Sequence, residues 1–128
     1  MGKEQINFRI LFRPPKYPVI IISADDLSSA SNIEKLGTLC VLSEPSEDDD
    51  NVRVIDSTGE EFWYLPEHFV LSPGFFPKKW TKKQVIDLFN SSVNAKEKNI
   101  QYPLKSLSNT RLSKIIVDIC EILSYPRL

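Results

Sequence analysis

Apolar and polar residues alternate in two short runs near the centre of the chain, at residues 52–56 and 62–65. A period of two is typical of β-strands, because successive side chains point to opposite faces of a sheet. Both runs carry apolar residues on both faces, so we expect both sides to be partly covered. The pattern predicts two strands of a barrel wall with a helix packed outside it.

The residues between these runs, 56–59, form a predicted hairpin turn. Asp56 can accept hydrogen bonds from its own downstream amides, and Gly59 tolerates a positive φ. A loop of about three to five residues would therefore join the two strands as an antiparallel hairpin.

Pro66 ends the second strand, because proline lacks a ladder donor and fixes φ. The chain can then turn once before it becomes extended again at residues 70–71. This segment, YLPEHFV, resembles the closing segment of Src-homology-three-like barrels, with Pro66 and Phe69 at the matching positions. The resemblance implies a small barrel. The aromatic opening strand of the peptide-binding members is absent from the sequence, so polyproline recognition does not follow.

Three more segments have the pattern of strands. Residues 6–12 alternate until Arg13-Pro14-Pro15, and residues 19–22 are β-branched throughout, which is typical of a strand buried on both faces. Residues 38–42 form the next apolar run. The polar stretch 23–36 between them predicts a long connection with a short helical turn that Gly37 can end.

The first predicted helix begins after Thr81. Thr81 is a favourable N-cap, Gln84 completes a capping box, and Trp80 with Val85 occupies the hydrophobic-staple positions. We expect this helix to run for about three turns and to end between residues 94 and 99.

The second predicted helix has apolar residues at spacings of three and four. Ser108 or Asn109 can cap its start, and Pro126 places its end near Ser124. Its apolar face consists of Leu112, Ile115, Ile116, Ile119, Ile122 and Leu123.

These elements predict one α+β domain in residues 1–128. We expect a small five-stranded, mainly antiparallel Src-homology-three-like barrel in residues 1–72, with two C-terminal helices from residues 78–128 packed on it.

Composition limits the function classes. The hydrophobic share of 41% allows a core, and the net charge of -1 provides no general attraction to nucleic acid or membranes. Cys40 and Cys120 lie in apolar runs, which favours buried free thiols. The amino terminus lacks an apolar signal core and no stretch approaches the length of a membrane span, so we expect a cytoplasmic protein without membrane contact.

Nothing in the sequence has the spacing of a catalytic motif, and we expect no enzyme activity, metal or cofactor. His68 is the single histidine, and no recognisable nucleophile motif accompanies it. The acidic loop 44–50 lacks the glycine and ligand positions of a calcium-binding loop. A small hydrolase that uses His68 is the least favoured alternative.

One charged cluster departs from the usual pattern of helix ends. Lysines surround Trp80 at the start of the first predicted helix, where the helix dipole favours acidic residues. This pattern is consistent with phosphate or nucleic-acid binding, although a solvated helix start is the favoured interpretation. The candidate anion-binding residues are Lys78, Lys79, Trp80, Lys82 and Lys83.

One aromatic cluster is a second candidate surface. Trp63 must point away from Phe62 and Tyr64 on a strand with a period of two. Core packing of Trp63 beneath the helices is the favoured interpretation, and a binding patch is the alternative. The candidate protein-binding residues are Trp63, Tyr64, Phe75, Glu47, Asp48 and Asp49.

We therefore expect a non-catalytic protein-protein interaction module. Its partner would be another protein or a second copy of this chain, and a small inhibitor or immunity-type protein is a subtype that the acidic loop permits. The alternative is a nucleic-acid or phosphate-binding protein that uses the lysine cluster.

Overall fold

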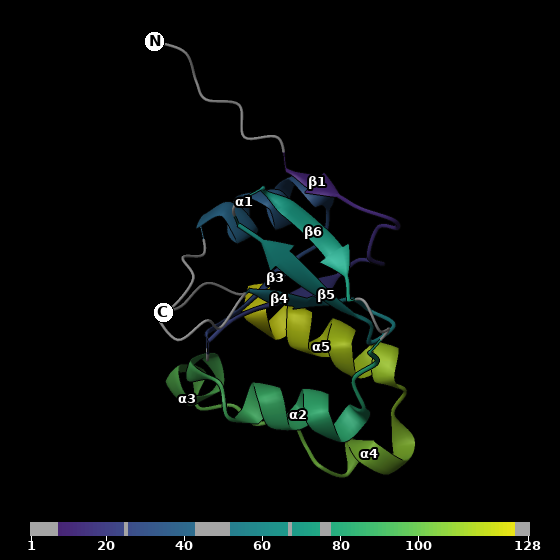
Figure 1. The fold of residues 1–128 in the computed structure, drawn as a ribbon. Coiled ribbons are helices and arrows are strands. Elements are labelled where there is room, and N and C mark those ends of the chain that lie inside the picture. The colour runs from purple at the N-terminus through teal and green to yellow at the C-terminus, as the bar shows by residue number, and fades with distance from the viewer. Residues whose placement is uncertain (1–7, 25, 43–51, 67, 75–77, 125–128) are drawn as a thin grey trace.

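The computed structural model describes residues 8–24, 26–42, 52–66, 68–74 and 78–124. This part of the chain forms one six-stranded sheet with helices on both faces (Figure 1). The strand order is β1-β6-β5-β4-β2-β3, in which β1 and β6 are parallel and all other neighbours are antiparallel. The strands are β1 (Arg9–Ile10), β2 (Val19–Ser23), β3 (Asp26–Ala30), β4 (Arg53–Ile55), β5 (Glu61–Leu65) and β6 (Val70–Pro73).

The helices divide between the two faces. α1 covers one face, whereas α5 packs on the other face and α2 packs against α5 (Figure 1). The helices are α1 (Ile33–Leu42), α2 (Lys82–Asn90), α3 (Val93–Lys98), α4 (Ser106–Asn109) and α5 (Leu112–Ser124).

The expected α+β class is confirmed, but the five-stranded barrel is wrong. β1 and β3 lie at opposite ends of an open, mixed sheet. The described residues form five helices, where we expected two. An open sheet is favoured because two sets of amphipathic helices each need an apolar sheet face to cover.

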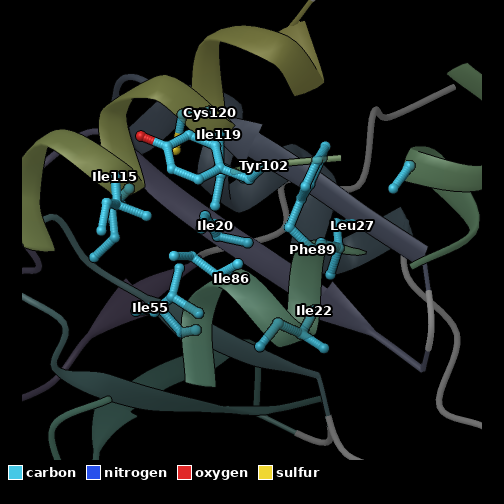
Figure 2. Packing of buried hydrophobic residues seen from close by; sticks show 13 residues of the cluster. Ile20, Ile22, Leu27, Ile55, Ile86, Phe89, Tyr102, Ile115, Ile119 and Cys120 are labelled. Atoms are coloured by element: carbon cyan, nitrogen blue, oxygen red, sulfur yellow. The ribbon is translucent and has the colours of Figure 1, made fainter. Parts of the chain in front are cut away.

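The central strand β2 explains why both faces are covered. Val19 and Ile21 belong to the core beneath α1, whereas Ile20 and Ile22 belong to the core beneath α5 and α2. All four side chains are buried, which confirms the predicted two-sided strand. Figure 2 shows Ile20 and Ile22 within the cluster that also contains Ile86 and Phe89 of α2 and the buried side chains of α5.

The predicted hairpin of β4 and β5 is confirmed. Asp56 is buried in the turn, and its Oδ1 accepts hydrogen bonds from the amides of Thr58 (2.9 Å) and Glu60 (3.1 Å). Gly59 has a φ of 89°, as the turn requires. After β5, the chain turns at Pro66 and continues as β6.

The expected strand at residues 38–42 is wrong, because these residues are the last turns of α1. Asn32 caps this helix through the amide of Lys35 (2.8 Å). Leu36 and Cys40, four residues apart, face the core. Gly37 lies inside the helix, so it does not end a helical turn as we expected.

The expected connection at residues 23–36 is also wrong, because it contains the edge strand β3. Asn94 of α3 completes this edge. Its Oδ1 accepts from the Leu27 amide (2.7 Å), and its Nδ2 donates to the Leu27 carbonyl (2.8 Å). The side-chain amide therefore pairs with Leu27 as the backbone of another strand would.

The capping box at the start of α2 is confirmed, with the Thr81 and Gln84 side chains each bonded to the other residue's backbone amide. The predicted end is wrong, because α2 stops at Asn90 and Ser92 caps the separate helix α3. A serine side chain that hydrogen-bonds to nearby backbone groups, as that of Ser92 does, favours the start of a helix over its interior.

The second predicted helix corresponds to α5, and its end at Ser124 is confirmed. Ile115, Ile116 and Ile119 are buried, whereas the other three apolar residues of its face are partly buried at the margin of the same core.

Cys40 and Cys120 are buried free thiols, as expected. Burial raises the pKa of each to about 12, so both are poor nucleophiles. Among the helices described, none is both long and apolar enough to span a membrane.

Candidate interaction surface

The sheet extends beyond its helical cover on one face. On the face that carries Ile55 and Ile20, α5 contacts β2 and β3. The register places Arg53, Trp63 and Leu65 on the same face, further toward β6. Trp63 is 37% exposed and Leu65 is 42% exposed, so this part of the face is open to solvent.

The centre of this region is the buried carboxylate of Glu61, which is 3% exposed. The indole Nε1 of Trp63 donates to Glu61 Oε2 (3.1 Å), and that of Trp80 donates to Glu61 Oε1 (3.0 Å). Hydrogen bonds to a carboxylate are stronger than those between neutral groups. The carboxylate therefore fixes both indole rings in defined orientations.

Two cations complete this arrangement. Arg53 Nη1 lies 3.5 Å from Glu61 Oε1, and Lys78 Nζ lies 3.7 Å from the same oxygen. The Arg53 guanidinium also lies 6.0 Å from the Trp63 ring centroid and 5.8 Å from that of Trp80. Each ring face can attract the cation at this distance. These contacts compensate the cost of burying the Glu61 charge.

A short backbone pairing brings Trp80 and Lys78 to this place. The Glu61 amide donates to the Lys78 carbonyl (3.0 Å), and the Trp80 amide donates to the Gly59 carbonyl (2.8 Å). β6 ends where Pro73 pairs with Phe62 of β5. Residues 78–80 then pair with the residues that precede Phe62, on the same side of the chain as β6. We call Arg53, Trp63, Leu65, Lys78 and Trp80 the tryptophan surface.

The structure corrects two expectations about the aromatic cluster. Trp63 is not covered by the helices, so its expected core packing is wrong. Tyr64 is only 1% exposed and belongs to the core beneath α1, so it is not available to a partner. The other candidate protein-binding residues lie outside the described residues, and they are Phe75, Glu47, Asp48 and Asp49.

The lysine cluster does not form one site. Lys82 Nζ donates to the Leu107 carbonyl (3.4 Å), and Lys83 pairs with Asp87 on its own helix (2.7 Å). Lys79 lies opposite Glu60 in the backbone pairing, so its side chain points to the opposite face of the sheet from that of Lys78. Of the five candidate residues, Lys78 and Trp80 reach the tryptophan surface.

The acidic loop 44–50, which was considered for calcium binding, lies outside the described residues. His68 is exposed on the turn between β5 and β6. The described residues include no group of three histidine, cysteine or acidic side chains placed to hold a metal ion.

Sequence reasoning missed Glu61 and Arg53. The alternation of β5 places Glu61 on the same face as Trp63, and this spacing was the one local sign that the two residues could interact. The link to Trp80 depends on a backbone pairing between distant residues that no local pattern indicates.

Comparison with protein-family models, curated proteins and solved structures finds no match for this chain.

Proposed function

We propose that this chain is a non-catalytic protein-binding module that uses the tryptophan surface. The observation that carries the proposal is the exposed Trp63 ring, fixed at its nitrogen by the buried Glu61 carboxylate. Trp and Arg dominate the binding energy of many protein interfaces. A side chain that is already ordered loses less conformational entropy on binding.

The surface also has the layout of a protein interface. Leu65 and Trp63 supply exposed apolar area, and the partly exposed Arg53 and Lys78 supply positive charge beside it. Protein interfaces commonly combine aromatic side chains and arginine with polar groups. The proposed partner is therefore a folded protein or a peptide segment.

Phosphate or nucleic-acid binding at the start of α2 is less favoured by the geometry. The capping box occupies the Thr81 and Gln84 amides, and Lys82 and Lys83 make contacts within the protein. An anion-binding helix start instead directs free amides and cations at one point.

The experiment is quantitative capture of partners from a lysate of the source cells, after nuclease treatment and at two salt concentrations. The variants are Trp63→Ala and Leu65→Ser, with Val117→Ala as the control. Val117 is 39% exposed on α5, far along the sheet from β5. Leu65 takes no part in the hydrogen bonds that join Glu61 to Trp63 and Trp80, so Leu65→Ser tests the surface even if Trp63→Ala disturbs the fold.

We expect a protein partner that survives nuclease and binds both surface variants about tenfold or more weakly. The control should bind as the unaltered protein does. Partners that bind all four proteins equally would refute the proposed surface. Material that disappears with nuclease would instead support the nucleic-acid alternative.

A further inference from the structure

In the part of the chain that the structure describes, cations outnumber anions around the tryptophan surface. Arg53 and Lys78 both approach the single carboxylate of Glu61. Arg9 of β1 is exposed and pairs with Val70, which pairs with Leu65, so the register places Arg9 on the same face. Counting described residues alone, three cations thus accompany one buried anion on this face. The excess positive charge favours a partner with negative charge.

Arg53 is the cation that is best ordered for recognition. Its guanidinium lies within 6.0 Å of both indole centroids, so the two rings restrict its position. Its Nη1 lies 3.5 Å from Glu61 Oε1, which holds the guanidinium beside the buried carboxylate. The side chain is 32% exposed. The guanidinium is therefore accessible in part, and the planar arrangement of its N–H donors suits a carboxylate.

The buried Glu61 carboxylate distinguishes between anions. An incoming group at Arg53 would lie close to this fixed negative charge. A side-chain carboxylate carries one negative charge and would meet less repulsion than a phosphate monoester, which carries up to about two. The exposed Leu65 and Trp63 also offer apolar contacts beside the cation.

We propose that the partner contributes an aspartate or glutamate to Arg53, with an apolar side chain beside it that contacts Trp63 and Leu65. This inference rests on the proposed function, because it names the chemistry of the protein that binds the tryptophan surface. The carboxylate would accept hydrogen bonds from the accessible part of the guanidinium.

The probe is a random peptide library displayed on phage and selected on the immobilised protein. Parallel selections use Arg53→Gln, Trp63→Ala and Arg111→Gln. Arg111→Gln is the charge-matched control, because Arg111 is exposed near the start of α5 and outside the tryptophan surface. Peptides enriched on the unaltered protein are then synthesised with each Asp or Glu replaced by Asn or Gln, and their affinities are measured by calorimetry.

We expect enriched peptides with an acidic residue near an apolar one. Replacing that acidic residue should weaken binding about tenfold, and Arg53→Gln should weaken it equally. The combination of both changes should add little to either alone, because both remove the same contact. Arg111→Gln should have no effect.

The inference fails if the enriched peptides depend on Trp63 but contain no acidic residue, or if Arg53→Gln leaves their affinity unchanged. The proposed function would survive that result. If the selection yields no peptide whose binding depends on Trp63, both proposals fail for peptide partners.

Discussion

The indole nitrogens of Trp63 and Trp80 donate to the two different oxygens of one buried carboxylate, that of Glu61. One ring belongs to β5, and the other belongs to the segment that leads into α2. The shared carboxylate therefore links the sheet to the start of the helical layer. It also orients the two rings that we assign to binding.

We expect Glu61→Gln to destabilise the protein by about 1 to 3 kcal/mol. The amide oxygen can still accept from one indole, but the amide nitrogen cannot accept from the other. Arg53 and Lys78 also lose their anion. Urea unfolding followed by circular dichroism measures the change, with Glu121→Gln on the exposed side of α5 as the control.

A second readout separates the Glu61 role from a general loss of stability. The two indole N–H resonances in a ¹⁵N spectrum should shift in Glu61→Gln while the folded spectrum is retained. Unshifted indole resonances, or unchanged stability, would contradict the assigned hydrogen bonds.

Gly59→Ala should destabilise the protein by about 1 to 3 kcal/mol. Gly59 has a φ of 89°, and a Cβ there would lie 2.7 Å from Leu112 Cδ2 and 3.2 Å from the Trp80 carbonyl oxygen. The substitution therefore combines backbone strain with a steric conflict between the hairpin turn and α5.

A double-mutant cycle with Leu112→Ala resolves the two contributions. The truncated side chain should relieve the steric part, so the combined loss of stability should be smaller than the sum of the single losses. Gly59→Asn, which tolerates positive φ better than alanine, should be less destabilising than Gly59→Ala. Strict additivity in the cycle would show that Leu112 plays no part.

Asn94→Ala should destabilise the protein by about 2 to 4 kcal/mol, because it leaves the buried amide and carbonyl of Leu27 without their partner. The Leu27 amide should also exchange its hydrogen faster. Asn94→Asp retains an acceptor for the amide but loses the donor to the carbonyl, so it should slow exchange relative to Asn94→Ala. Equal exchange of the Leu27 amide in all three proteins would exclude the pairing.

Local signals predicted the parts of the fold that depend on local chemistry. The hairpin turn followed from Asp56 and Gly59, and the start of α2 followed from Thr81 and Gln84. In each case neighbouring residues supply the hydrogen bonds themselves. The six-residue apolar face likewise identified α5 correctly.

The missed elements depend on distant contacts. β3 has a polar sequence, and its Leu27 and Ser29 bond to Asn94 and to the Cys120 carbonyl. The run 38–42 is short and apolar, a pattern that suits a strand or a buried helix equally. The tryptophan surface was missed for the same reason, because Glu61 joins two segments that the sequence presents as separate clusters.

Alkaline pH should destabilise the protein through Tyr102. Burial and the hydrogen bond to Asp118 Oδ2 (2.7 Å) raise the pKa of Tyr102 from 10.0 to about 12. The folded state therefore keeps the neutral phenol where the unfolded chain ionises. This contribution to stability is complete below pH 10 and is lost as the pH rises toward about 12.

Tyr102→Phe should be less stable than the unaltered protein at neutral pH, because it lacks the hydrogen bond to Asp118. Its free energy of unfolding should decline less steeply between pH 10 and about 12. Some decline should remain, because burial also raises the pKa values of Tyr17 and Tyr64. Urea unfolding of both proteins at several pH values in this interval measures the two slopes. Parallel slopes would show that the Tyr102 phenol has the same pKa in the folded and unfolded states, contrary to its position beside Asp118.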